Sequence, residues 1–79
     1  MNNKKIQRTL KKIEFYKEEQ QGYKTILNNL ICKYNILNDD MKAIFKDRQE
    51  LHVNSCIRNI KRCDDKITEL NNKLELFNK

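Results

Sequence analysis

The second half of the chain carries apolar or small residues at spacings that alternate between three and four. These positions are Val53, Cys56, Ile60, Cys63, Ile67, Leu70, Leu74 and Phe77. An average spacing of 3.5 residues places such side chains along one stripe of a helix that packs against another helix. The pattern therefore predicts a long helix with a coiled-coil-like packing seam.

The first half of the chain has a seam of its own, with one irregular step near Tyr16. Its positions are Ile6, Leu10, Ile13, Tyr16, Gln20, Tyr23, Leu27, Leu30, Tyr34, Leu37 and Met41. When this spacing is continued past Met41, it does not reach Val53 and Cys56. One straight helix cannot present both seams on the same face, so the chain is expected to break between them.

Two segments between the seams carry residues that can begin a new helix. Asn38 can cap a helix, and Asp39 and Asp40 would then lie in its first turn, where the helix dipole favours acids. Asn54 and Ser55 offer a second capping site, which leaves a turn at residues 52–55 as the alternative. We favour the first segment because of the residue pairs that it creates.

A reversal at residues 38–40 places the two seams opposite each other. Ile13 then faces Ile67, and Tyr34 faces Phe45. The large Tyr16 and Tyr23 face small partners, as interdigitating layers require; those partners are Cys63 and Cys56. The Gln20–Ile60 and Leu30–Gln49 layers are the weak points of this register.

We therefore predict an all-α fold, an antiparallel helical hairpin with coiled-coil-like packing. Residues 1–79 form a single domain, with helix 1 at about residues 3–37, the turn at about 38–40 and helix 2 at about 40–78. Gly22 is the only glycine, and it weakens the first helix by about 1 kcal/mol relative to alanine. Whether it interrupts that helix is left open by the sequence.

Further apolar residues lie beside the two seams. They are Phe15, Ile26, Ile31, Ile36, Ile44, Leu51, Ile57 and Leu76. Wide apolar stripes are typical of helices with more than one neighbour, and a chain of 79 residues buries little surface by itself. We therefore expect a homodimer of hairpins that forms a four-helix bundle.

The composition argues against enzymatic chemistry, cofactors and a membrane span. Cys32, His52, Cys56 and Cys63 include metal-binding residue types, but their spacing matches no compact zinc site, and buried apolar roles are usual for cysteine. The single histidine leaves a cysteine nucleophile without a supported base. An odd number of cysteines, three, favours reduced thiols and hence a cytoplasmic location.

The net charge of +6 is unevenly distributed. The first basic group crowds the N-terminal segment before any acid occurs and comprises Lys4, Lys5, Arg8, Lys11 and Lys12. The second group comprises Arg58, Lys61, Arg62 and Lys66. In the predicted register the two groups lie near each other, so they are candidates for binding phosphate backbones or an acidic partner.

These features predict a small protein-protein interaction module that acts as an adaptor, regulator or inhibitor of a larger assembly. The alternative is a nucleic-acid-associated accessory protein that uses the basic helical patch. The seam residues on which the hairpin depends are Ile6, Leu10, Ile13, Tyr16, Tyr23, Leu27, Val53, Cys56, Ile60, Cys63, Ile67, Leu70 and Leu74.

Overall fold

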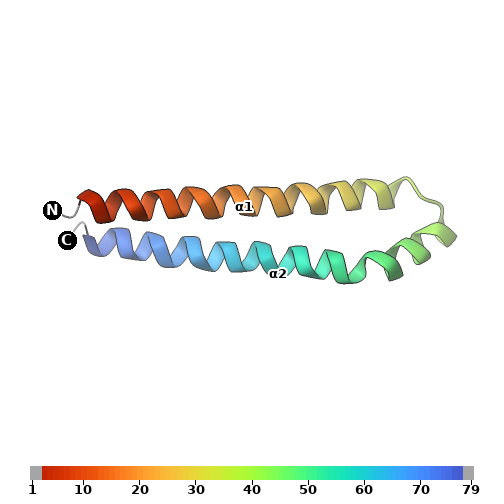
Figure 1. The fold of residues 1–79 in the computed structure, drawn as a ribbon. Coiled ribbons are helices and arrows are strands. Elements are labelled where there is room, and N and C mark those ends of the chain that lie inside the picture. The colour runs from red at the N-terminus through yellow and green to blue at the C-terminus, as the bar shows by residue number, and fades with distance from the viewer. Residues whose placement is uncertain (1–2, 78–79) are drawn as a thin grey trace.

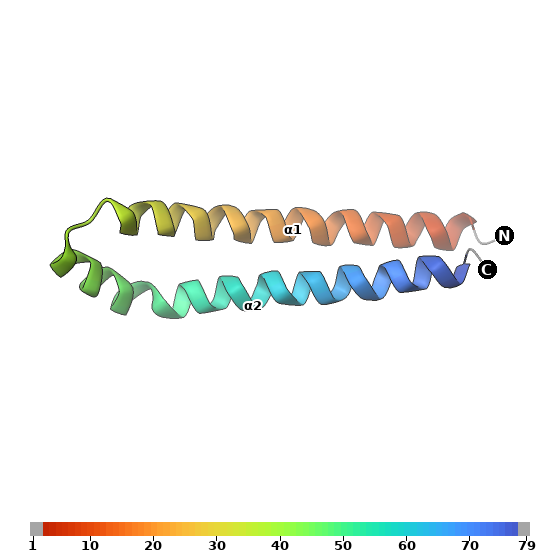
Figure 2. The ribbon, with the colours of Figure 1, turned by 180° about the vertical axis from the view of Figure 1, so that it is seen from behind.

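Two long helices lie antiparallel in the computed structural model, which describes residues 3–77. Helix α1 spans Asn3–Asn35 and helix α2 spans Asp39–Phe77. The described chain ends lie side by side at one end of the molecule and the turn lies at the other, as Figures 1 and 2 show. The rod measures 61 × 14 × 14 Å. The all-α helical hairpin predicted from the two seams is confirmed.

The turn lies at residues 36–38, close to the predicted 38–40 and far from the alternative at 52–55. The Oδ1 atom of Asn38 accepts a hydrogen bond of 2.9 Å from the Met41 amide, as expected of a helix cap. Helix α1 ends at Asn35, two residues before its predicted end at residue 37. A hydrogen bond of 3.2 Å from the Leu37 amide to the Tyr34 carbonyl tightens the chain where it leaves the helix. Asn78, the predicted end of the second helix, lies outside the described residues.

Gly22 does not interrupt helix α1, which is continuous across it. The glycine is exposed, and a Cβ atom added there would meet no neighbouring atom within 4 Å. The presence of glycine at position 22 is therefore explained neither by a kink in α1 nor by a close approach of α2. Its effect on the hairpin is therefore expected to be that of helix propensity alone.

Replacing Gly22 with alanine is expected to stabilise the hairpin by about 1 kcal/mol, because alanine restricts the unfolded chain and costs nothing in the open space around residue 22. Chemical denaturation followed by circular dichroism measures this gain. Ala43 is an exposed alanine within α2, so Ala43→Gly provides the reverse control, with a loss of similar size. A loss of stability in Gly22→Ala would contradict the structure at this position.

The packing seam of α1 differs from the prediction at one position. Leu10 is 45% exposed, whereas Thr9 is only 7% exposed and takes the place expected for Leu10. The Thr9 hydroxyl donates a hydrogen bond of 2.8 Å to the Lys5 carbonyl, which satisfies this polar group inside the seam. With Thr9 in the seam the alternation of three and four is unbroken from Ile6 to Leu37, and the irregular step near Tyr16 disappears. The other predicted α1 seam residues up to Leu37 are buried or half-buried.

Two contacts fix the register of the helices. The rings of Tyr34 and Phe45 pack with their centroids 6.3 Å apart, which is the pair expected near the turn. Near the middle of α1, the side-chain amide of Gln20 donates a 3.0 Å hydrogen bond to the Ile60 carbonyl and a second bond to the Asp64 carboxylate. The weak Gln20–Ile60 layer is thus polar but satisfied, as a buried amide requires.

The hydrophobic core is small for the length of the rod. Among the described residues, the buried apolar side chains are Ile13, Cys56, Cys63 and Leu70. A compact monomer of 9.6 kDa exposes roughly 5,100 Å² by the usual scaling with mass, whereas this hairpin exposes 6580 Å². The surplus of surface means that packing between α1 and α2 alone gives limited stability.

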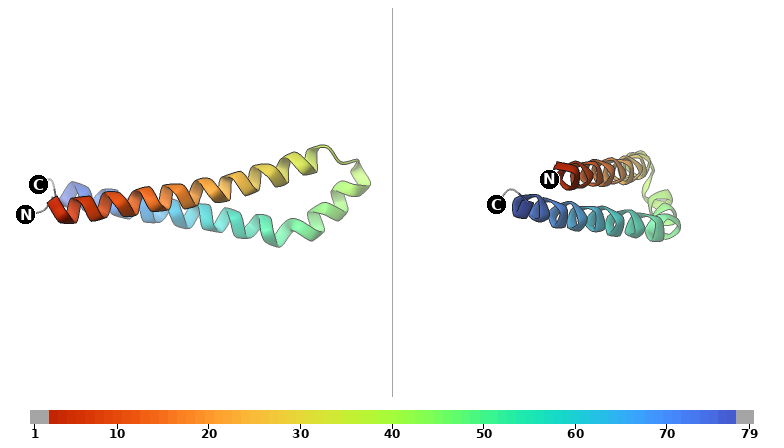
Figure 3. Two further views of the ribbon diagram at one scale, coloured as in Figure 1. Left: turned by 45° about the horizontal axis from the view of Figure 1, so that its top comes forward. Right: turned by 60° about the vertical axis from the view of Figure 1, so that its left-hand side comes forward.

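Helix α2 departs from the heptad spacing in its first half. Phe45, Gln49 and Val53 are half-buried and follow one another at two successive steps of four. An extra step of four locally unwinds a coiled coil, because the contact stripe then drifts around the helix. Figure 3 shows α2 curving away from α1 in its green part. The seams of the two helices therefore separate between the turn and the middle of the rod.

Candidate interaction surfaces

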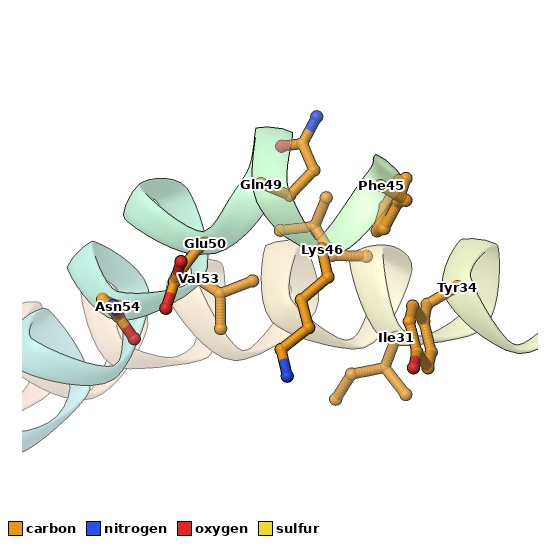
Figure 4. A pocket seen from close by; sticks show the side chains of 9 residues that line it. Ile31, Tyr34, Phe45, Lys46, Gln49, Glu50, Val53 and Asn54 are labelled. Atoms are coloured by element: carbon orange, nitrogen blue, oxygen red, sulfur yellow. The ribbon is translucent and has the colours of Figure 1, made fainter. Parts of the chain in front are cut away.

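A groove opens between the helices where α2 curves away from α1. We call it the central groove; it has a volume of about 330 Å³ and is lined by Leu30, Ile31, Tyr34, Phe45, Lys46, Gln49, Glu50, Val53 and Asn54. Figure 4 shows the side chains of Lys46 and Gln49 running in opposite directions from α2. The weak Leu30–Gln49 layer is thus where the helix packing opens, since both of its residues line the central groove.

A second, smaller groove lies next to the turn. This turn groove has a volume of about 210 Å³ and is lined by Leu37, Met41, Ile44, Phe45, Arg48 and Gln49. Phe45 and Gln49 line both grooves, so this short stretch of α2 has an opening on each flank. The ring of Tyr34, on the central groove, also has the Lys42 ammonium 5.3 Å from its centroid.

The seam divides the exposed surface of the hairpin into two sides. In a heptad whose seam occupies positions a and d, positions b and e lie on one flank and positions c and g on the other. In an antiparallel pair, the b and e flanks of both helices lie on one side, and the c and g flanks of both helices lie on the other. We assign heptad position a to Ile6 in α1 and to Val53 in α2. Before the extra step in α2, position a belongs to Gln49. These three assignments give every charged residue on a flank its heptad position.

We call the two sides the basic side and the neutral side. The basic side holds the acids Glu19 and Glu69, against the cations Lys5, Arg8, Lys12, Lys33, Arg48, Arg62, Lys66 and Lys73. The neutral side sets Lys17, Lys24, Lys46 and Lys61 against Glu14, Asp39, Glu50, Asp64 and Glu75, so its net charge is close to zero. The grooves agree with this assignment, because Lys46 and Glu50 line the central groove while Arg48 lines the turn groove.

The structure divides the predicted basic patch among three surfaces. All nine of its residues are exposed, but only Lys5, Arg8, Lys12, Arg62 and Lys66 share the basic side. Heptad position f puts Lys4, Lys11 and Arg58 on the outer backs of the helices, and position b puts Lys61 on the neutral side. Within residues 3–77 the single ion pair joins Lys66 to Glu69 across 3.7 Å, and both side chains are exposed.

The exposed apolar residues also favour the basic side. By heptad position this side holds Phe15, Ile26, Met41, Ile44, Leu51 and Leu76, each of them a large exposed side chain. The neutral side holds Leu10, Ile31 and Ile57. One side of the hairpin therefore combines a strong positive charge with an uncovered apolar row.

The thiols divide into one accessible and two buried groups. Cys32 is exposed, whereas Cys56 and Cys63 lie in the seam, and Cys63 is fully buried. Burial raises the pKa of the Cys63 thiol, and the negative charge of Glu19 raises that pKa further. Both effects favour the protonated, unreactive form of Cys63.

The part of the chain that the structure describes shows no cluster of three or more histidine, cysteine, aspartate or glutamate residues suited to holding a metal ion. His52 and Cys32 therefore do not join Cys56 and Cys63 in such a group. Over the same residues, neither helix combines the length and the apolar character that crossing a membrane requires.

Sequence reasoning missed the residues that form the central groove. Lys46, Glu50 and Asn54 line it from α2 but belong to neither of the predicted seams. The signal that locates them is the pair of four-residue steps from Phe45 through Gln49 to Val53, which marks where α2 drifts away from the heptad pattern.

A comparison of the chain with protein families, curated proteins and solved structures finds no match.

Proposed function

We propose that this hairpin is a non-enzymatic protein-interaction module that packs its helices against those of other chains, as an adaptor, regulator or inhibitor of a larger assembly does. The observation that carries the proposal is the row of large apolar side chains left uncovered along both sides, with Ile57 51% exposed on the neutral side and Leu76 67% exposed on the basic side. Exposed apolar surface on this scale is characteristic of surfaces that bind other proteins.

The first partner that we propose is a second copy of the chain, bound through the neutral side. A twofold interface brings the same patch of each copy together, so a side whose charges nearly cancel meets itself with little repulsion. Ile31 and Ile57 would pack around the central groove, and Lys46 of one copy would pair with Glu50 of the other. The surplus surface of roughly 1,500 Å² exceeds the roughly 800 Å² that each partner buries in a standard interface.

Light scattering coupled to size exclusion, at micromolar concentration, is expected to give about twice the chain mass of 9.6 kDa. Ile31→Ser is expected to shift this dimer toward monomer, because it removes an apolar side chain from the neutral side. Ile36→Ser is the matched control, since Ile36 lies in the turn and belongs to neither side. A monomer that melts cooperatively at every concentration would contradict the proposed dimer.

A second candidate function is supported by the cations of the basic side. Lys5, Arg8 and Lys12 lie at the open end of α1 on the same side as Arg62 and Lys66, and such groups bind phosphate backbones without reading sequence. A nucleic-acid accessory protein of this kind would show duplex binding that weakens steeply with salt.

A further inference from the structure

We propose that the basic side is a docking site for an acidic amphipathic helix of another protein. This inference rests on the proposed function, since it assumes that the hairpin works by packing helices, and it names the chemistry of the partner. The partner would lie across the basic side of α1 and α2, with one end at the turn groove, and it would carry acids on both flanks of an apolar stripe.

The charge of the basic side excludes a second copy as its occupant. Its eight cations outnumber Glu19 and Glu69, so two such sides placed face to face would repel each other. The charges on the neutral side nearly cancel, which concentrates the positive potential of the molecule on the basic side. The partner that this potential selects is acidic.

The apolar row defines the partner as a helix. Phe15, Ile26 and Ile44 lie along the basic side between its cations, and the turn groove adds a concave site with Arg48 on its wall. A helix binds such a surface with apolar anchors at spacings of three and four residues. Its flanking acids would then reach Lys12, Arg48 and Arg62.

The same row argues against a nucleic-acid backbone as the occupant. Surfaces that bind single strands combine cations with aromatic rings on which bases stack. The basic side offers a single exposed aromatic ring, Phe15, and its other large exposed apolar residues are Ile26, Met41, Ile44, Leu51 and Leu76. Aliphatic side chains gain by contact with another apolar surface rather than with phosphates.

The probe is a synthetic helical peptide of four heptads, with leucine at positions a and d and glutamate at e and g. We expect it to bind the full chain with a micromolar Kd, measured by fluorescence anisotropy, and to bind about tenfold more weakly when salt rises from 50 to 500 mM. A peptide with lysine at e and g tests the charge requirement. A peptide with serine at a and d tests the apolar requirement, and both changes are expected to abolish binding.

Two matched triple variants locate the site. Lys5→Gln, Lys12→Gln and Arg62→Gln together neutralise three cations of the basic side and are expected to weaken peptide binding about tenfold. Lys4→Gln, Lys11→Gln and Arg58→Gln together remove the same charge from the outer backs of the helices and are expected to change the Kd less than twofold. Ile44→Ser is expected to weaken binding at all salt concentrations, because it removes an apolar contact beside the turn groove.

Each outcome decides between the alternatives. Equal weakening by the two triple variants, or equal binding of the lysine peptide, would overturn the proposed site. Binding of a 20-base-pair duplex that is tighter than binding of the acidic peptide, and that is lost in the basic-side triple variant, would assign the side to nucleic acid instead. Failure of the peptide to bind a chain that still forms a dimer by light scattering would overturn this inference alone and leave the proposed function standing.

Discussion

Leu70→Ala is expected to abolish the cooperative thermal melting of the hairpin. Leu70 is one of the four apolar side chains buried in the described residues, and truncating a buried leucine costs about 2–5 kcal/mol through lost contacts and the cavity that remains. A core this small supplies only about 3–5 kcal/mol in all. Circular dichroism at 222 nm during heating is expected to show a broad loss of helix rather than a single transition.

The control for this experiment is Leu51→Ala in the same helix. Leu51 is 82% exposed, so the same chemical change is expected to alter stability by about 0.5 kcal/mol or less. Because both variants replace leucine with alanine, helix propensity changes equally in each. Similar melting curves for the two variants would contradict the placement of Leu70 in the core.

The three thiols are expected to react with iodoacetamide at very different rates. Cys32 is exposed and is expected to react at the rate of an unfolded peptide, whereas Cys63 is fully buried and reacts only after the helices separate. We expect Cys63 to be about 100-fold slower, since an opening free energy of about 3 kcal/mol lowers the open population by that factor. Lys33, Arg58 and Arg62 place the cysteines in separate tryptic peptides, so mass spectrometry can follow each one.

Denaturant supplies the control, because in the unfolded chain all three cysteines are expected to react at similar rates. The raised pKa of Cys63 adds a pH dependence. The folded state binds the thiol proton more tightly than the unfolded state, so this contribution to stability is present below the ordinary thiol pKa of about 8.5 and is lost as the pH rises above it. A Cys63→Ala chain is expected to show a flatter fall of Tm with pH in this range.

The seams and the turn could be predicted because they depend on local signals. The alternation of three and four marks the buried stripe of each helix, and Asn38 with Asp39 and Asp40 marks the start of the second one. The pairing of Tyr34 with Phe45 then follows, since the position of the turn fixes which residues face each other. Two amphipathic helices joined by a short turn leave few other arrangements.

The sequence misled where hydrophobicity and geometry disagree. Leu10 is more apolar than Thr9, but a strict alternation of three and four from Ile6 places Thr9 in the seam. The helix buries Thr9 because its hydroxyl can donate a hydrogen bond to a carbonyl of the same helix. The central groove is not predicted from the sequence for a related reason. Hydrophobicity marks Gln49 only as a weak layer, whereas the two steps of four around it shift the contact stripe of α2 and open the packing.

The side-by-side placement of the outer ends of α1 and α2 has a mechanical consequence. A force that pulls Asn3 and Phe77 apart acts across the pair of helices and loads one layer of the seam at a time. The layers near Ile6 and Leu74 separate before those near Tyr34 and Phe45, so the hairpin unzips from its open end toward the turn. A partner that pulls on these ends would therefore meet low resistance, and on release the layers beside the turn would close first, because the chain between them is shortest.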